Sequence, residues 1–371
     1  MMIYPKYENS TLSAITSILK YYGIDSQHVS QKAIDEALKK KYKNIVFMIF
    51  DGMGESILES HKEVARFLTE HHRTTLSSVF PSTTTAAIIS LESGLSPIEH
   101  GWLGWSLYFK EVDANVSVFP NTLSGSQGEP AADYHLGRRH MPYQDVLDQI
   151  NGISHGKFHA VRVSPFSDIK PSSVSEMCEK VISISKEQKE TCIFTYWPQP
   201  DFDMHDLGTK HEKISAIMKD INNQVQDMCS KLKDTLVIIT ADHGLIDTKW
   251  RFLMDYPELV DCFSRRPSVE TRASSFFIKE GFTKQFKLLF NDLFKDEFLL
   301  FSKEEILKQN LFGTGVPHER CNDFIGDYVA VAISNYSFEY NRVDENTLFK
   351  ATHAGLTEEE MNVPLIIVPI K

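Results

Sequence analysis

A short apolar run that ends in an acidic and a basic side chain is the feature of this sequence that most restricts its fold. Residues 235–240 read Thr-Leu-Val-Ile-Ile-Thr, and Asp242-His243-Gly244 follows one residue later. Such a run is typical of a strand buried on both faces of a sheet. Because α/β sheets bind ligands at the carboxyl ends of their strands, the Asp-His pair is well placed to hold a divalent cation there.

The same pattern recurs along the chain. Residues 44–50 form a second apolar run, which Asp51-Gly-Met-Gly follows directly. Further strands are predicted at 159–163, 192–197, 328–333 and 365–368. Amphipathic helical patterns separate several of these strands, most clearly at 214–228. We therefore predict a layered α/β fold, helix/sheet/helix, with a mostly parallel central sheet.

The 371 residues divide into three parts of different character. Residues 1–42 are predicted to be a helical lead-in. Residues 43–247 and 344–371 carry the strand pattern and are predicted to form the metal-binding α/β domain. Residues 248–343 contain a short strand-like run and aromatic-rich helical segments, which indicates an inserted α+β subdomain.

Charge and cysteine content restrict the partners and the compartment. The formal net charge is -11, and no dense Lys/Arg stripe would follow a nucleic-acid backbone, so no nucleic-acid polymer is expected. Five widely spaced cysteines without a Cys-x-x-Cys pair indicate reduced structural thiols. The amino terminus resembles no secretory leader, and no later run approaches a membrane span. We expect a cytoplasmic protein with no membrane partner.

Two segments near the first strand offer oxygen ligands. Gly52 and Gly54 allow the backbone to turn sharply after Asp51, which would leave its carboxylate at the rim of the sheet. For Asp51 alone, a turn-forming Asp-Gly is the commoner explanation. Residues 82–85 read Ser-Thr-Thr-Thr before an apolar run, so their hydroxyls lie where a helix N-terminus would favour a phosphate. Helix capping alone is the commoner role of such a cluster.

Two later segments offer carboxylate and imidazole ligands. Asp201 and His205 are four residues apart, which places both on one face of a helical turn, whereas Asp203 would point elsewhere. His353, shortly before the last strand, adds a third imidazole, although a lone His is more often an ordinary residue. Together the segments supply three carboxylates, three imidazoles and a hydroxyl, enough for two divalent ions with open positions.

The ordered set of motifs resembles the alkaline phosphatase superfamily and, within it, the nucleotide pyrophosphatase/phosphodiesterase branch. The resemblance runs from residue 44 to the carboxyl terminus. It rests on Phe-Met-Ile-Phe-Asp51-Gly-Met-Gly, Phe-Pro-Ser-Thr-Thr84-Thr, Glu92-Ser-Gly94-Leu-x-Pro-x-x-His100-Gly101, Pro200-Asp201-x-x-x-His205, Thr240-Ala-Asp242-His243-Gly244 and His353-Ala-Gly355.

The resemblance implies two metal sites and a nucleophile. One metal would be held by Asp51, Thr84, Asp242 and His243, and the other by Asp201, His205 and His353. The nucleophile of the family lies ten residues before the Gly of its Thr/Ser-Gly-Leu segment, which selects Thr84 and leaves Thr83 as the alternative. Thr84 would attack phosphorus and form a phospho-threonine intermediate on a small phosphodiester or pyrophosphate substrate. Zinc suits three imidazoles, and manganese accepts the same ligand set.

The sequence departs from the family at the substrate side. Thr85-Ala86-Ala87 stands where relatives have Phe-Pro-Asn, and the Phe of that motif helps to stack a nucleobase. Relatives also have an Asn shortly after His-Gly that binds a phosphate oxygen, whereas this chain reads His100-Gly-Trp-Leu-Gly-Trp105. Asn121 is a candidate replacement, with a neutral turn Asn as the alternative. Arg272 could reach an anionic leaving group, but a structural ion pair is the commoner role.

Three other functions compete with the phosphodiesterase. A phosphomonoesterase or phosphomutase of the same superfamily would show basic residues near the nucleophile, and none stands between Arg73 and Lys110. A sulfatase would need a Cys/Ser-x-Pro/Ala-x-Arg motif, which the sequence lacks. A non-catalytic protein that keeps the fold would not require every ligand type to be present, as they are here.

Overall fold

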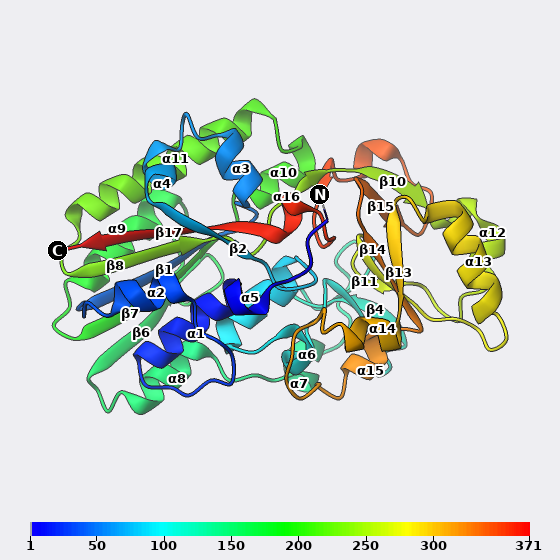
Figure 1. The fold of residues 1–371 in the computed structure, drawn as a ribbon, viewed down its shortest axis with the longest axis horizontal. Coiled ribbons are helices and arrows are strands. Elements are labelled where there is room, and N and C mark those ends of the chain that lie inside the picture. Colours follow the sequence, from blue (N-terminus) through cyan, green and yellow to red (C-terminus); the bar gives the residue numbers. More distant parts are fainter. Residues whose placement is uncertain (1) are drawn as a thin grey trace.

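The computed structural model describes residues 2–371 and shows an elongated molecule with one large β-sheet in each half (Figure 1). The first sheet has the strand order β2-β17-β8-β1-β7-β6. Its strands are β1 (Asn44–Phe50), β2 (His72–Ser77), β6 (Phe158–Val163), β7 (Glu190–Trp197), β8 (Thr235–Thr240) and β17 (Asn362–Ile370). Both predicted apolar runs, 44–50 and 235–240, are strands of this sheet, and they are neighbours buried along their whole length.

The first sheet is mixed. β1 pairs in parallel with β7 and with β8, and β6 pairs in parallel with β7. β17 is antiparallel to both of its neighbours, β8 and β2. The expectation of a mostly parallel central sheet is therefore not confirmed, because β17 lies between β8 and β2 and runs antiparallel to both.

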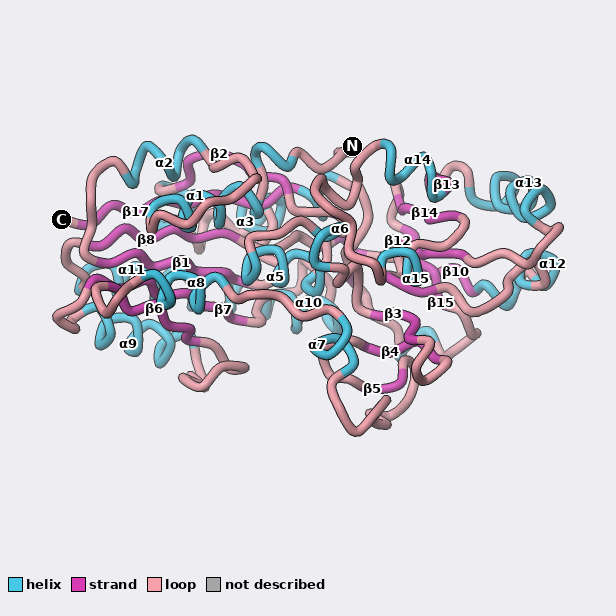
Figure 2. The backbone as a smooth tube through the Cα atoms, turned by 90° about the horizontal axis from the view of Figure 1, so that it is seen from below, coloured by secondary structure: helices cyan, strands magenta, loops and turns pink. Residues whose placement is uncertain are grey.

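Helices cover both faces of the first sheet (Figure 2). One layer contains α1 (Thr11–Tyr21), α2 (Lys32–Leu38), α5 (Thr84–Ser93) and α8 (Val146–Ile153), and the other contains α4 (Arg66–Glu70), α9 (Val174–Ser185) and α11 (Glu212–Lys231). Side-chain capping starts several of them; Ser10 caps α1 and Ser173 caps α9. The predicted pattern at 214–228 lies within α11, where Ile214, Met218 and Ile221 face the core.

The second sheet is antiparallel, with the order β13-β14-β12-β11-β3-β4-β5. Its strands are β3 (Ser106–Phe109), β4 (Ala114–Ser117), β5 (Thr122–Leu123), β11 (Ser268–Val269), β12 (Ala273–Phe276), β13 (Phe298–Ser302) and β14 (Tyr328–Ala332). The segment 248–343 thus supplies four strands and the segment 106–123 supplies three. The predicted bounds of an inserted subdomain, residues 248–343, stay a prediction.

Alternation along β14 separates two cores in this half. Val329 and Val331 face one apolar cluster, whereas Ala330 and Ala332 face a second cluster rich in phenylalanine. α13 (Thr283–Phe294) closes the second cluster with Phe286, Phe290 and Phe294. Shorter helices of this region are α12 (Pro257–Val260), α14 (Lys303–Lys308) and α15 (Cys321–Phe324).

The remaining elements are short. They are α3 (Glu55–Ser60), α6 (Pro97–His100), α7 (Leu136–His140), α10 (Asp201–Leu207), α16 (Glu358–Met361), the strand pairs β9 (Ile246–Asp247) with β16 (Ala351–Thr352) and β10 (Lys249–Phe252) with β15 (Tyr336–Glu339), and 3-10 turns at Tyr7–Asn9, Leu253–Asp255 and Glu345–Thr347. All five cysteines are buried and free. Among residues 2–371, no helix combines the length and apolar character that crossing a bilayer requires.

The strand directions point to one region of the molecule. β17 runs toward the carboxyl terminus at the far end of the first half, and β1, β7 and β8 run the opposite way (Figure 1). Their carboxyl ends therefore face the second half, and the segments that follow these three strands meet between the two sheets.

Candidate functional site

Two glycine contacts bring the turns after β1, β7 and β8 together. Gly52 has a positive φ of 71°, and a Cβ there would lie 2.8 Å from the Asp201 Cβ. A Cβ on Gly54 would lie 2.5 Å from the Gly244 Cα. Only glycine allows both approaches, and they place Asp51 beside Asp201 and beside the 242–244 segment.

Asp51 and Asp242 are buried carboxylates that face the same point. The Gly52 N–H donates to Asp242 Oδ1 over 3.1 Å, and Tyr196 donates its hydroxyl hydrogen to Asp51 Oδ2. The His243 ring lies beside them, with Nε2 3.4 Å from Asp51 Oδ1 and 3.5 Å from Asp242 Oδ2. Asp51, Asp242 and His243 thus form one group of ligand atoms within 4.8 Å of one another.

The His243 tautomer is set by its backbone neighbour. Nδ1 lies 3.1 Å from the Gly244 carbonyl oxygen. Because a carbonyl can only accept, Nδ1 carries the proton and Nε2 keeps a lone pair that faces Asp51 and Asp242.

Asp201 and His205 lie on one face of α10, as the spacing predicts. His205 Nε2 is 3.2 Å from Asp201 Oδ2, and His205 Nδ1 donates to the Ala351 carbonyl over 2.8 Å. The latter bond connects α10 to β16, which directly precedes His353. Asp203 is turned away and pairs with Lys213 at 2.8 Å.

His353 completes the cluster. Its ring stacks on that of His243 with centroids 3.9 Å apart and lies 5.3 Å from that of His205. Asp201, His243 and His353 form the second group of ligand atoms within 4.8 Å. All six Asp and His residues expected as metal ligands therefore lie in one cluster.

The three threonines after Ser82 point in different directions. Thr84, the first residue of α5, has its Oγ1 3.1 Å from His243 Nε2. Thr83 instead donates its hydroxyl hydrogen to Glu270 Oε1 over 2.7 Å. The Thr85 hydroxyl is buried without a hydrogen-bond partner. Thr84 is thus the hydroxyl of this row that faces the Asp/His cluster.

The cluster is electrostatically strained. Burial, reinforced by Asp242 and Asp201, raises the pKa of Asp51 well above its usual range, and burial also raises the pKa of Asp242. For Asp201 burial acts in the same direction, but His205 and His353 outweigh it and hold its pKa low. Burial next to His243 lowers the pKa of His353, so its imidazole stays neutral. Three carboxylates in so small a buried space call for positive charge.

The unpaired atoms of the cluster fit divalent metal ions. Asp51 Oδ1, Asp201 Oδ1, Asp242 Oδ2 and His353 Nδ1 are buried without any hydrogen-bond partner. Buried polar atoms are normally hydrogen-bonded, so several orphaned acceptors in one cluster indicate a place for a ligand. Carboxylate oxygens and imidazole nitrogens without thiolate are the donor set of zinc and manganese.

Asn121 uses both ends of its amide within its own loop. Its Nδ2 donates to the Tyr134 carbonyl over 2.9 Å, and its Oδ1 accepts from the Leu136 N–H over 2.8 Å. Its φ of 59° lies in the left-handed region, which Asn tolerates well. These are features of a loop-forming Asn.

Arg272 forms a buried ion pair with Glu360, which had no signal in the sequence. The Arg272 Nε donates to Glu360 Oε1 over 2.6 Å, and neither side chain is exposed. Glu360 also accepts from the Gly355 N–H, while its own carbonyl accepts from the Gly244 N–H. The pair thus fixes the segments that carry His353 and His243.

Sequence reasoning also missed Tyr196 and Glu270. Tyr196 is the last residue but one of β7, the strand before Asp201, and its hydroxyl orients the carboxylate of Asp51. Glu270 lies in the turn between β11 and β12, 187 residues from the Thr83 that it contacts. A contact between such distant segments has no signature in a single sequence.

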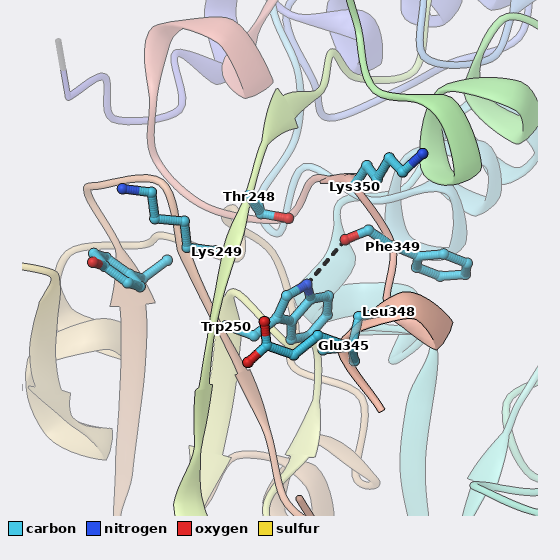
Figure 3. A pocket seen from close by; sticks show the side chains of 8 residues that line it. Thr248, Lys249, Trp250, Glu345, Leu348, Phe349 and Lys350 are labelled. Atoms are coloured by element: carbon cyan, nitrogen blue, oxygen red, sulfur yellow. Dashed lines mark hydrogen bonds between the residues drawn. The ribbon is translucent and has the colours of Figure 1, made fainter. Parts of the chain in front are cut away.

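A surface pocket of about 410 Å³ adjoins the His205 side of the cluster (Figure 3). Trp250, Tyr336, Leu348 and Phe349 line it, together with Lys249, Lys350, Thr248 and Glu345. The Trp250 indole donates to the Phe349 carbonyl over 2.9 Å, and the Phe349 ring stacks on His205 with centroids 4.3 Å apart. The pocket borders the cluster without containing any of the predicted ligands.

An α/β fold that gathers buried Asp and His side chains around a threonine at its strand ends is typical of metal-assisted hydrolases. Comparison with known proteins gives the particular family. The family model described as type I phosphodiesterase/nucleotide pyrophosphatase matches residues 45–355. The chain belongs to this family of the alkaline phosphatase superfamily, and it is a phosphodiesterase/nucleotide pyrophosphatase-like hydrolase.

Solved structures share the fold at low sequence identity. Murine ectonucleotide pyrophosphatase/phosphodiesterase 5 is 16% identical with a TM-score of 0.63, and the match covers 86% of this chain and 87% of that one. An inactive threonine-to-alanine variant of the murine protein, in complex with AMP, matches equally well. The human protein is 15% identical with a TM-score of 0.65 and 87% coverage of both chains. No curated protein matches this chain by sequence.

Proposed function

We propose that this chain hydrolyses a small phosphodiester or pyrophosphate substrate with two divalent metal ions and a phospho-threonine intermediate on Thr84. The observation that carries the proposal is the cluster itself. Three buried carboxylate oxygens lack a hydrogen-bond partner, and the Thr84 hydroxyl points at the lone pair of His243 beside them. This arrangement suits cations that bind the carboxylates and activate the hydroxyl.

The residues divide between two ions. Asp51, Thr84, Asp242 and His243 would hold one, and Asp201, His205 and His353 the other. When bound, the ions supply positive charge that lowers the pKa of the Thr84 hydroxyl and neutralises the negative charge of the phosphoryl group. Zinc suits a set with three imidazoles, and manganese accepts the same donors.

The protein itself contributes orientation. Thr84 begins α5, so its hydroxyl and the free N–H groups of the first helical turn face the same side, and the helix N-terminus favours a phosphoryl anion. The Gly244 carbonyl keeps His243 in one tautomer, the Ala351 carbonyl does the same for His205, and Tyr196 orients Asp51. These partners preorganise the ligands before substrate arrives.

The reaction would proceed in two steps. The oxygen of deprotonated Thr84 attacks phosphorus in line and expels the alcohol or phosphate leaving group, which forms the phospho-threonine. Water then attacks the same phosphorus from the vacated side and releases Thr84 with a phosphomonoester or phosphate product. The inactive threonine variant of the murine neighbour, which binds AMP, supports a threonine nucleophile and a nucleotide-sized substrate by analogy.

Metal analysis together with paired substrates tests the proposal. We expect the purified protein to bind two divalent ions and to hydrolyse bis(4-nitrophenyl) phosphate faster than 4-nitrophenyl phosphate. Treatment with a chelator should remove the activity, and zinc or manganese should restore it. A protein that binds no metal and hydrolyses neither ester would contradict the proposal and support a non-catalytic role.

A further inference from the structure

Glu270 is a carboxylate beside the nucleophile without a cationic partner. Its Oε1 accepts from the Thr83 hydroxyl and from the Trp105 N–H, each over 2.7 Å. Among residues 2–371, no Lys or Arg forms an ion pair with it. A carboxyl group in crowded surroundings without a counter-ion is unfavourable. Its contact with Thr83, the residue before Thr84, therefore suggests a function.

The turn that carries Glu270 is held rigidly. The preceding residue, Val269, has a φ of 82°, which a β-branched residue adopts only when its surroundings impose it. The Val269 carbonyl packs so closely on Gly104 that a Cβ there would lie 2.6 Å from it. On the other side of the turn, Arg272 is anchored by Glu360. The Glu270 carboxyl is therefore fixed between Thr83 and Trp105.

The carboxyl group lies within electrostatic range of the cluster. Burial raises the pKa of the Glu270 carboxyl, and the hydrogen bonds from Thr83 and Trp105 and the charge of His205 oppose this rise. Part of the Glu270 side chain stays accessible, and Oε1 takes both of its hydrogen bonds. Oε2 is thus left without a hydrogen bond from the described part of the chain.

A charge count shows what Glu270 adds. Two divalent ions bring four positive charges, which the carboxylates of Asp51, Asp201 and Asp242 and a deprotonated Thr84 would offset. Ionised Glu270 then leaves an excess negative charge next to the phosphoryl position. That charge repels a phosphomonoester dianion more strongly than a phosphodiester monoanion.

We propose that Glu270 is a specificity-determining residue that excludes doubly charged phosphomonoesters from Thr84 and so selects singly charged phosphodiesters. The inference rests on the proposed phosphodiesterase function. It also gives a reason why no Arg or Lys stands between Arg73 and Lys110, around the nucleophile.

The test compares the ratio of kcat/KM for bis(4-nitrophenyl) phosphate to that for 4-nitrophenyl phosphate. The zinc-loaded full chain is assayed at pH 8.5, where the monoester is a dianion and Glu270, with a pKa of about 7, is ionised. Glu270→Gln keeps the shape and both acceptor contacts but removes the charge. We expect the ratio to fall by about tenfold, whereas Glu270→Asp, which retains the charge, should keep most of the wild-type preference.

Controls separate selectivity from structure. Glu297→Gln removes a carboxylate that pairs with Arg251 away from the cluster, and it should leave the ratio unchanged. Glu270→Ala repeats the charge removal if Glu270→Gln does not fold. An unchanged ratio in folded Gln or Ala variants, or an equal loss on both esters with both metals bound, would overturn the role of Glu270. A wild-type protein that hydrolyses no diester would instead refute the proposed function.

Discussion

Two buried charge clusters lie close together in this molecule, and they differ in how their polar atoms are satisfied. In the pair of Arg272 and Glu360, every nitrogen of the guanidinium has an acceptor: the Glu360 carboxylate and the carbonyl oxygens of Ser334 and Tyr336. Both Glu360 oxygens also accept further hydrogen bonds, from Gly355 and Thr357. Nothing in this pair is left for a ligand.

The Asp/His cluster shows the opposite state. One oxygen each of Asp51, Asp201 and Asp242 is buried without a partner, although a hydrogen bond is the normal condition of a buried polar atom. A complete network holds segments in place, whereas an incomplete one marks a place where a ligand supplies the missing interactions. The comparison therefore assigns a structural role to the first cluster and a chemical role to the second.

Replacing the nucleophile should separate chemistry from structure most sharply. We expect Thr84→Ala to lower kcat by about a thousandfold or more, because no other hydroxyl of the 83–85 row faces the cluster. The other six proposed ligands remain, so metal content should be nearly intact by elemental analysis. Thr85→Ala is the matched control and should keep most of the activity. Full activity in Thr84→Ala would remove this residue from the mechanism.

Disrupting the buried Arg272–Glu360 pair should lower the free energy of unfolding more than any surface change does. Arg272→Met leaves the buried Glu360 carboxylate without its cationic partner, and we expect the free energy of unfolding to fall by about 3–5 kcal/mol. Urea unfolding of the metal-loaded protein measures this. Arg342→Met, which removes an exposed and solvent-screened pair with Asp255, is the control and should cost far less. A comparable small cost for Arg272→Met would contradict the structural role of the pair.

The sequence predicts features that depend on local patterns, and it does not predict contacts between distant segments. The strands at 44–50 and 235–240 and the helix around 214–228 follow from local apolar patterns, and the ligands at their ends follow from spacing. The second sheet joins strands from 106–123 with strands beyond 268, a pairing that no local pattern encodes. Arg272, Glu360 and Glu270 act through contacts between distant segments, so their partners became visible only in the structure.

Metal-free protein should lose stability as the pH rises above about 6.5, the ordinary pKa of histidine. The pKa of His205 is raised because Asp201 outweighs burial, and burial raises that of Asp51. A group whose pKa is higher in the folded than in the unfolded state stabilises the folded protein fully below its unfolded-state pKa. This stabilisation is lost as the pH rises through its folded-state pKa. For His205 this loss begins above its ordinary pKa of 6.5. The pKa values of Asp201 and His353 are lowered, so the titration of these two groups changes the stability only below the ordinary His pKa of 6.5.

In the metal-loaded protein, the gain from metal binding should offset this loss of stability in the same window. Ligands must be deprotonated to bind metal, so affinity increases with pH, and the stabilisation by zinc should grow by up to about 1.4 kcal/mol per pH unit for each proton released. Calorimetry of chelator-treated and zinc-loaded protein at pH 7, 7.75 and 8.5 measures the difference. A stabilisation that is independent of pH would show that the Asp/His cluster does not bind the added metal.

We expect the smallest effect on activity at Asn121, which tests whether polar groups with all their hydrogen bonds made have only a structural role. Its amide is satisfied at both ends by its own loop, so by the same reasoning it belongs with the structural residues. Asn121→Ala should change kcat/KM by less than about threefold and lower the free energy of unfolding by about 1–2 kcal/mol, since two hydrogen bonds and a residue suited to positive φ are lost. A direct contact between this amide and a phosphate oxygen would instead lower kcat/KM by about tenfold or more with little change in stability. That result would show that a satisfied polar group can still serve the substrate, and the rule drawn from the two clusters would then hold only for charged residues.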